Sequence, residues 1–350
     1  MMPLSDLRHY RMPAEWDPHR GTILTWPHRP AIWRGIHAEV EATFCTLGRC
    51  LSEVEEVHIN VPDLGWQTRV TTQLEAAGAD LARVVFHAVD SDDVWARDHG
   101  PIFVVRRAEA PPELPQLAML DWEFNAWGGK FAAALDNQIP EKMNTFFGVP
   151  RLQPGLVMEG GSLEVNGAGD LLTTEAVLLH ANRNPRHDRG SIEQALGQAL
   201  GVTRLHWLGA GLAGDDTDGH IDDIARFVAP DAIVAVTAPR GHPDHAALSA
   251  NLARLQRLRG GPLDRPFRVG TLPSPEPIRF QDEHLPASYA NFYVANGLVI
   301  VPVFKQRADD EALALLQASF PERRVVGVDG RALVTQYGNV HCVTQQIPLV

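Results

Sequence analysis

Five residues with reactive or ionisable side chains recur at regular intervals along the chain. They lie in the segments RDHGP, MEGGS, DGHIDD and GNVHC, and they are Asp98, Glu159, His220, Asp222 and Cys342. Glu159 follows Asp98 by 61 residues, and His220 follows Glu159 by another 61. Cys342 follows His220 by 122, which is twice 61. Because repeating architectures bring equivalent loops together, this spacing predicts one shared site.

A thiol and an imidazole in one site favour covalent chemistry at an electron-poor carbon. The thiolate is the attacking species, and a neighbouring imidazole can favour it or carry the proton of a leaving group. Several carboxylates beside this pair disfavour a general Cys-His amidase or protease, because they would repel a developing oxyanion. They suit a planar cation with a fork of N–H groups, which describes a guanidinium. The predicted substrate class is therefore a small cationic guanidine.

The spacing of His220 and Asp222 gives a more specific expectation. If Asp222 lies on a strand that begins at His220, both side chains point to the same face and into one pocket. Asp98 could then hold the opposite edge of the guanidinium. Taken singly, each residue has a structural explanation, such as an ion pair with Arg97 or a turn cap at Glu159. Their equivalent placement in successive units favours the functional interpretation.

The elements that must position these residues are helices, strands and hairpins in alternation. Apolar residues recur at helical spacing over the ranges 36–54, 66–77, 139–147, 190–200, 244–258 and 309–318. Short β-branched runs follow most of them, at 57–61, 82–89, 202–208, 267–272 and 323–328. Four of these passages lead into a loop and a hairpin pattern, in segments that begin DHGPI, EGGSL, HIDDI and YANFY.

Five such units fit the chain length, with the first hairpin near GTILTWP and the last strand closing beside it. The predicted fold class is α/β, built from repeated hairpin, helix and strand units around a central site. A doubly wound sheet is the alternative, but the chain lacks a G-x-G-x-x-G turn between a strand and a helix. The predicted antiparallel pairs favour an arrangement closer to a propeller.

The composition favours a globular protein and disfavours some partners. Apolar residues form 45% of the 350 residues, and the net charge of -12 argues against binding to nucleic acid or to an anionic membrane surface. The N-terminal segment lacks the apolar core of a secretory signal, and the longest apolar run, 294–304, is too short to span a bilayer. Three cysteines without disulfide or zinc-ligand spacing predict free thiols in the cytoplasm.

Seven segments, spread from about residue 13 to the C-terminus, form a specific combination. They are EWDPHRGTILTWP, DDVWARDHGPI, FNAWGGKFAAALDNQ, EGGSLEVNGAGDLLTTEAVLLHANRNP, GDDTDGHIDDIARF, ASYANFYVANGLVIVPVF and GNVHCVTQQ. Together they resemble the agmatine deiminase family of guanidine-modifying enzymes, which includes bacterial peptidylarginine deiminase-like proteins. EGG or HID alone would be weak signals.

The resemblance implies a five-bladed, pseudo-symmetric, pentein-like α/β propeller, with residues 1–350 in one catalytic domain and no metal or organic cofactor. By position, Cys342 resembles the nucleophile, His220 the general acid and base, and Glu159 a catalytic carboxylate close to His220. Asp98 and Asp222 resemble the anchors of the guanidinium. A homodimer is compatible with this kind of enzyme.

The activity that the resemblance implies is hydrolysis of agmatine to N-carbamoylputrescine and ammonia, a step in putrescine and polyamine synthesis. The chain departs from plant-type members at Ala31 and His99. Because these departures bear on the far end of the substrate, a peptidylarginine or free-arginine deiminase that produces citrulline stays open. An amidinotransferase and a catalytically silent guanidine-binding protein are remoter alternatives.

Four residues near the expected catalytic loops are candidates to bind the aliphatic linker and the amine of the substrate. Trp95 and Trp127 are candidate walls, while Asp93 and Asp216 are candidate charge partners. Ordinary core packing explains the tryptophans equally well, and turn or cap roles explain the aspartates.

Overall fold

The computed structural model describes residues 4–350, so residues 1–3 of the predicted domain lie outside the described part. Five sheets of three or four strands dominate these residues. Two sheets have four strands, in the spatial orders β21 (Gln345–Pro348), β2 (His19–Thr25), β3 (Glu56–Val61), β4 (Val84–Ala88) and β1 (Tyr10–Arg11), β5 (Ile102–Arg106), β6 (Leu117–Leu120), β7 (Arg151–Leu152). Two sheets have three strands, in the orders β10 (Arg204–Leu208), β9 (Asp170–Thr174), β8 (Glu164–Val165) and β11 (Ala225–Ala229), β12 (Ala232–Thr237), β15 (Arg268–Pro273). The fifth sheet also has three strands, in the order β18 (Tyr293–Ala295), β19 (Leu298–Val303), β20 (Arg324–Asp329).

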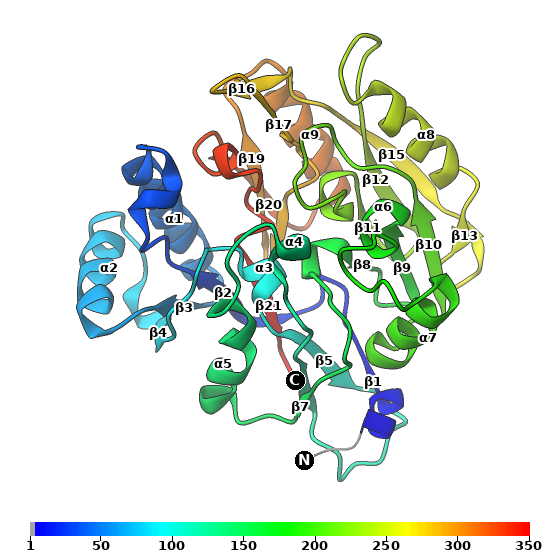
Figure 1. The fold of residues 1–350 in the computed structure, drawn as a ribbon, viewed down its shortest axis with the longest axis horizontal. Coiled ribbons are helices and arrows are strands. Elements are labelled where there is room, and N and C mark those ends of the chain that lie inside the picture. Colours follow the sequence, from blue (N-terminus) through cyan, green and yellow to red (C-terminus); the bar gives the residue numbers. More distant parts are fainter. Residues whose placement is uncertain (1–3) are drawn as a thin grey trace.

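All five sheets share one plan, an antiparallel pair followed by a parallel strand. The pairs β5–β6, β8–β9, β11–β12 and β18–β19 are antiparallel, and β7, β10, β15 and β20 then add in parallel. In the remaining sheet, β2 pairs with β21 antiparallel and with β3 in parallel, so distant parts of the chain supply its antiparallel pair. In Figure 1 the sheets lie at successive positions around the middle of the molecule.

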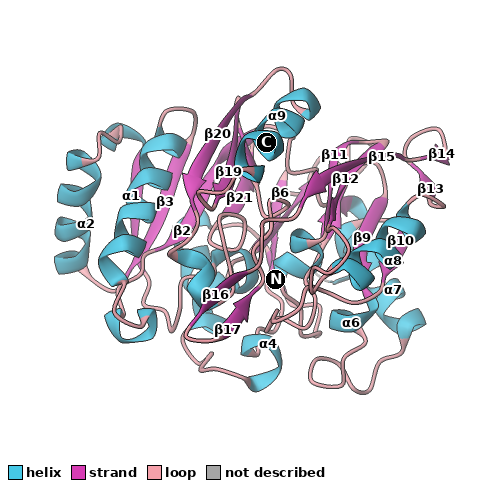
Figure 2. Cartoon of the chain, turned by 90° about the horizontal axis from the view of Figure 1, so that it is seen from above, coloured by secondary structure: helices cyan, strands magenta, loops and turns pink. Residues whose placement is uncertain are grey.

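A helix lies in the connection to most of the parallel strands, as such crossovers require. The longer helices are α1 (His37–Ser52), α2 (Leu64–Ala76), α5 (Ile139–Phe147), α7 (Arg189–Leu200), α8 (His245–Leu255) and α9 (Ala308–Ser319). Figure 2 shows α1 and α2 on one outer side of the strands and α7 and α8 on the opposite side. The short helices α3 (Ala96–His99), α4 (Ala126–Gly129) and α6 (Glu175–Leu178) belong to connecting segments.

Local sequence signals set several helix ends. Asp63 and Asp188 accept hydrogen bonds from the main-chain N–H groups of Trp66 and Ser191, and so cap the starts of α2 and α7. Gly201 ends α7 at a φ of 68°, which lies in the left-handed region that glycine adopts easily. These signals explain why the helices predicted from apolar spacing begin and end within a few residues of the expected positions.

The remaining elements are two small sheets and seven 3₁₀ helices within residues 4–350. The small sheets pair β13 (Arg259–Gly260) with β14 (Arg265–Pro266), and β16 (Ile278–Phe280) with β17 (Glu283–Leu285). The 3₁₀ helices are η1 (Leu4–His9), η2 (Pro30–Trp33), η3 (Leu81–Arg83), η4 (Asp136–Gln138), η5 (Gly160–Ser162), η6 (Ile221–Asp223) and η7 (Leu333–Gln336). Two of them, η5 and η6, carry or adjoin predicted site residues.

The core forms between the sheets and their helices. One cluster packs Phe44 and Leu47 of α1 against β3 and the buried Trp33. Cys50 belongs to the same cluster and Cys45 packs against it, which confirms that these thiols are small core residues. Of the helices in residues 4–350, none has the length and apolar character needed to cross a membrane.

The sheet topology excludes one of the two predicted architectures. The α/β class, the six longer helices and the four hairpins are confirmed. The expected closure of the last strand beside the first hairpin segment is confirmed by the pairing of β21 with β2. The doubly wound sheet is wrong, because five separate sheets with antiparallel pairs replace one continuous parallel sheet.

Candidate active site

A cavity of about 240 Å³ lies beside Cys342. Six of the nine predicted site residues line it, together with residues from η7 and the loops around it. The full lining is Ile32, Asp93, Trp95, Asp98, Trp127, Phe131, Asp216, Thr217, Gln336, Tyr337, Gly338 and Cys342. The other three predicted residues, Glu159, His220 and Asp222, are almost fully buried against this lining. Ala31 and His99 are not among the lining residues.

The predicted catalytic residues occupy equivalent places, in the segments that lead into one strand of an antiparallel pair. Asp98 lies in α3 before β5, and Glu159 directly precedes η5 and β8. His220 precedes η6 and β11, while Cys342 precedes β21. The position of Asp222 differs from the prediction, because this residue lies inside η6 and β11 begins only at Ala225. The expected strand from His220 to Asp222 is therefore wrong, and a 3₁₀ turn brings the two side chains together.

Gly161 marks the point where three of these side chains converge. A Cβ added at Gly161 would lie 2.5 Å from His220 Nδ1, 2.9 Å from Asp98 Oδ1 and 3.1 Å from Asp222 Oδ2. The first two separations are shorter than real Cβ contacts and the third is tighter than most, so a side chain at this position would displace its neighbours. The glycine of MEGGS thus makes room for the imidazole and two carboxylates.

His220 lies between carboxylates from neighbouring units. Its Nδ1 is 3.8 Å from Asp98 Oδ1, and its Nε2 is 3.9 Å from Glu159 Oε2. Its main-chain N–H donates to Asp215 at 3.2 Å and to Thr217 Oγ1 at 3.2 Å. Burial lowers the pKa of His220, but the surrounding carboxylates outweigh this effect and raise it above its ordinary value. The raised pKa makes the imidazole a better proton acceptor.

Arg183 holds Glu159 through the carboxylate oxygen that does not face His220. Its Nε donates to Glu159 Oε1 at 2.5 Å, and its other nitrogens bind Asp218 at 2.6 Å and the Thr217 carbonyl at 2.9 Å. Burial raises the pKa of Glu159, and Arg183 opposes the rise. Within residues 4–350, Glu159 Oε2 and the facing His220 Nε2 have no hydrogen-bond partner. Both atoms therefore have unused hydrogen-bonding capacity.

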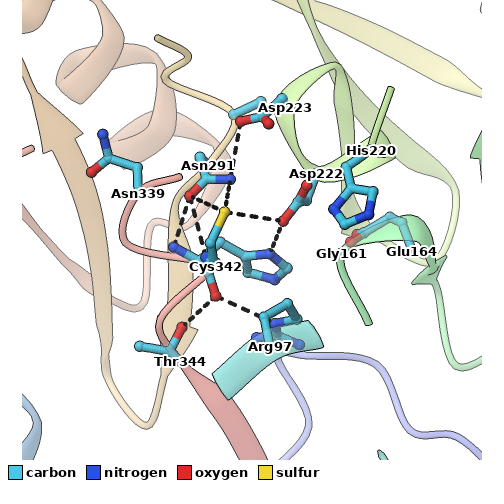
Figure 3. A network of polar contacts seen from close by, with 12 residues as sticks. Arg97, Gly161, Glu164, His220, Asp222, Asp223, Asn291, Asn339, Cys342 and Thr344 are labelled. Atoms are coloured by element: carbon cyan, nitrogen blue, oxygen red, sulfur yellow. Dashed lines mark hydrogen bonds and ion pairs between the residues drawn. The ribbon is translucent and has the colours of Figure 1, made fainter. Parts of the chain in front are cut away.

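Cys342 is buried among acidic groups. Burial raises the pKa of its thiol well above the ordinary value, and Asp222, Asp223 and Asp98 raise it further. Its sulfur lies 4.0 Å from Asp222 Oδ2 and 3.2 Å from Asn291 Nδ2 (Figure 3). The thiol is therefore protonated beside these carboxylates, and a bound cation would favour the thiolate.

A buried histidine holds Asp222 in place. His341 Nδ1 lies 2.6 Å from Asp222 Oδ2, and its Nε2 lies 2.7 Å from Glu15 Oε2. Glu15 also accepts hydrogen bonds from Arg97 at 3.1 Å and from Arg226 at 2.9 Å. Burial raises the pKa of Asp222, but the hydrogen bond with His341 and the charges of His341, His220 and Arg226 together outweigh this effect and lower it. Asp222 therefore stays charged where a cation can bind.

The remaining predicted residues form the walls of the cavity. Asp98 accepts from Trp127 Nε1 at 3.0 Å and from the Gly161 main-chain N–H at 2.9 Å, so Trp127 also orients a carboxylate. Burial raises the pKa of Asp93 to about 7, and that of Asp216 also to about 7. Their acidic neighbours Asp136 and Asp215, respectively, add to the rise. Both groups therefore change charge near neutral pH.

Several residues in contact with the site carry no role in the sequence-based prediction. They are Glu15, Arg183, Asp215, Asp223, Asn291 and His341. Each lies in a segment that contributes to the family resemblance, including EWDPH, HANRN, ASYAN and GNVHC. Membership of these segments is the signal that could have identified them. Their individual partners depend on distant parts of the chain, which only the structure supplies.

Comparison with known proteins gives a consistent result. The model of the Porphyromonas-type peptidyl-arginine deiminase family matches residues 11–348. The agmatine deiminase of Stutzerimonas stutzeri (strain A1501) is 36% identical over 97% of this chain and 95% of its own length.

Solved structures extend this similarity to the fold. The putative arginine deiminase of Porphyromonas gingivalis is 38% identical, with a TM-score of 0.88 over 97% of this chain and 98% of that one. A cysteine-to-serine variant of C. jejuni agmatine deiminase with substrate bound is 29% identical, with a TM-score of 0.86 over 97% of this chain and 96% of that one. The chain belongs to the Porphyromonas-type peptidyl-arginine deiminase family, and it has relatives that are agmatine deiminases.

Proposed function

We propose that the protein is an agmatine deiminase, a hydrolase that converts agmatine and water to N-carbamoylputrescine and ammonia. The observation that carries this proposal is the acidic cavity that Cys342 and Asp98 line, with His220 buried against it. A thiol nucleophile and several carboxylates in one cavity suit a guanidinium better than a neutral acyl group. The agmatine deiminase relatives support the same assignment.

The substrate is proposed to bind with its guanidinium between Asp98 and Asp222. Glu159 Oε2, which faces His220, would accept a further N–H of the fork. Trp95 and Trp127 would flank the aliphatic linker, because both line the cavity. The ammonium at the far end would pair with the two lining carboxylates, Asp93 and Asp216.

In the first half of the proposed reaction, Cys342 attacks the central guanidinium carbon. The bound cation favours the thiolate, and His220 takes the thiol proton. A sulfur–carbon bond forms, and the resulting tetrahedral adduct loses ammonia after His220 protonates the departing nitrogen. A covalent thiouronium on Cys342 remains.

In the second half, His220 acts as a base on a water molecule. The hydroxide adds to the thiouronium carbon, the sulfur–carbon bond breaks, and His220 returns the proton to the Cys342 sulfur. The protonated ureido product loses its extra proton to solvent. The enzyme is thereby restored, and one water has replaced one ammonia.

The lining of the cavity favours agmatine over arginine and arginyl peptides. Agmatine lacks the carboxylate of arginine, and that group would lie near the carboxylates of Asp93 and Asp216. Like charges at this end would discriminate against arginine. A peptide would also have to fit its main chain beside Phe131 and Tyr337, which line the same cavity.

A panel of agmatine, arginine and a blocked arginyl peptide tests the proposal, with ureido product and ammonia as readouts. We expect turnover of agmatine without an added acceptor amine, and no turnover by the Cys342→Ser variant. Preference for the peptide or for arginine would overturn the substrate assignment. Unchanged activity of the Cys342→Ser variant would overturn the mechanism.

We further propose that residues 1–350 form one catalytic domain, arranged as a five-bladed, pseudo-symmetric α/β propeller. The shared strand plan of the five sheets and the pairing of β2 with β21 support this arrangement. A homodimer and a cytoplasmic location stay predictions. Light scattering of the purified protein tests the first, and cell fractionation tests the second.

A further inference from the structure

Asn291 lies in the segment that leads into β18, two residues before the strand begins. Its side chain is fully buried and faces Cys342 in Figure 3. The regular spacing of the catalytic segments has one gap, the interval of 122 residues between His220 and Cys342. Asn291 falls inside this interval, 71 residues after His220 and 51 before Cys342. Asn291 thus comes from the repeat unit of β18, β19 and β20, which supplies none of the predicted catalytic residues.

The contacts of Asn291 fix the orientation of its amide. Its Oδ1 lies 2.9 Å from the main-chain nitrogen of His341 and 3.4 Å from that of Cys342. Main-chain N–H groups can only donate, so the atom that faces them must be the amide oxygen. The NH₂ group therefore lies 3.0 Å from Asp223 Oδ1 and 3.2 Å from Cys342 Sγ. The same sulfur lies 3.5 Å from Asn291 Oδ1, which can accept from the thiol while the thiol is protonated.

This orientation provides one N–H for each of two acceptors. One hydrogen of the NH₂ group serves the Asp223 carboxylate, and the other is available to the sulfur of Cys342. The other side chain in polar contact with this sulfur is the Asp222 carboxylate, at 4.0 Å. A carboxylate cannot donate to a thiolate, whereas an amide N–H can, and such hydrogen bonds strengthen when the acceptor carries charge.

We propose that Asn291 is a further catalytic residue, whose Nδ2–H donates to the Cys342 sulfur and holds the thiolate in position for attack. This role rests on the proposed deiminase function. The hydrogen bond strengthens as the thiol loses its proton and weakens when sulfur bonds to the guanidinium carbon. It strengthens again when the sulfur–carbon bond breaks and the thiolate departs. Asn291 therefore assists both halves of the reaction.

Two variants, Asn291→Ala and Asn291→Ser, test the proposal. We expect the alanine variant to lower kcat about 10- to 100-fold, as for loss of one hydrogen bond to a charged group, with a smaller change in KM. The second readout needs no substrate and is the pH dependence of Cys342 alkylation by iodoacetamide. Alkylation of the Cys342→Ser protein measures the reaction of Cys45 and Cys50, which is subtracted. The midpoint of this profile should move to higher pH in both variants.

A matched control separates catalysis from folding. Asn251 is also buried, and within residues 4–350 its side chain binds the Gly209 main-chain N–H at 2.8 Å and the Ala210 carbonyl at 2.9 Å rather than the sulfur. The Asn251→Ala variant should lose stability and keep the wild-type alkylation profile. An unchanged profile and kcat in the Asn291 variants would overturn the proposal.

The wild-type protein provides a second measurement, in case both Asn291 variants fail to fold. In protein labelled with ¹⁵N-asparagine, the side-chain amide signal of Asn291 should follow the titration of Cys342. A signal that is indifferent to that titration would overturn the proposal. Failure of wild-type protein to deiminate agmatine would instead overturn the proposed function, because the alkylation and amide readouts need no substrate.

Discussion

The acidic groups around Cys342 determine which molecules can activate it. Burial and three neighbouring carboxylates raise the pKa of the thiol, so the thiol stays protonated when a neutral ligand binds. A guanidinium brings the positive charge that the site lacks. Sequence spacing was enough to predict this thiol and its neighbours Asp98 and Asp222, but not Asp223. It could not predict Asn291, because an uncharged amide in an apolar strand segment gives no sign of the sulfur that it contacts.

The two aspartates proposed to bind the amine of the substrate give a prediction about pH. The pKa of Asp93 and that of Asp216 are each about 7, so both carboxyls are neutral below this pH and charged above it. An ammonium binds the charged forms, so the KM for agmatine should rise as the pH falls through about 7. Steady-state kinetics across this range, with butylguanidine as an amine-free control, measure the effect.

The control should show a smaller pH dependence of KM than agmatine between about pH 6 and 8. An Asp93→Asn, Asp216→Asn double variant should remove the difference between the two substrates. If butylguanidine and agmatine follow the same KM profile in wild-type protein, the two aspartates do not bind the amine.

At the scale of elements, short turns before the hairpins place the catalytic groups. The helices and hairpins were predictable because their apolar periodicity extends over many residues. The 3₁₀ turns η5 and η6 were not, because three residues carry too little pattern. The strand expected from His220 to Asp222 illustrates the difference, since the alternating pattern there begins only with β11 at Ala225.

The close approach of η5 to His220 predicts a large effect of one methyl group. The Gly161→Ala variant should lose kcat/KM by about 100-fold or more, because its Cβ would displace His220 and Asp98 from their positions. Kinetic assays with agmatine and a thermal melt measure activity and folding separately. Gly190→Ala is the matched control, because the nearest atom to its Cβ would be Asp188 Oδ1, at an ordinary 3.7 Å. Wild-type activity in Gly161→Ala protein would contradict this account of the site.

At the scale of the whole molecule, one buried carboxylate joins several units. Glu15 binds Arg97 beside β5, Arg226 in β11, the Val294 main-chain N–H in β18 and His341 before β21. Burial raises the pKa of Glu15, but its cationic partners outweigh this effect and lower it well below the ordinary value. The sequence could not reveal this cluster, because its members come from five separate segments and are recognisable only once the fold is known.

Removal of this charge should destabilise the whole fold. We expect the Glu15→Gln variant to lose about 3–5 kcal/mol of unfolding free energy at pH 7, because it leaves buried cations without their partner. Because the folded-state pKa of Glu15 is depressed, its contribution is present above the unfolded pKa of about 4.3 and is lost as the pH falls further. Urea denaturation followed by tryptophan fluorescence measures both effects. An unfolding midpoint equal to that of the exposed control Glu113→Gln would contradict the prediction.

The pairing of β2 with β21 also affects how the protein tolerates a break in its chain. A cut in the exposed segment between β5 and β6 would divide the chain into two fragments, with β2 in one and β21 in the other. The two would still be joined by this ladder and by the β5–β6 pairing. Limited proteolysis at that segment should therefore yield a nicked protein whose pieces stay associated. The two fragments, produced separately, are natural candidates for reassembly into a split enzyme.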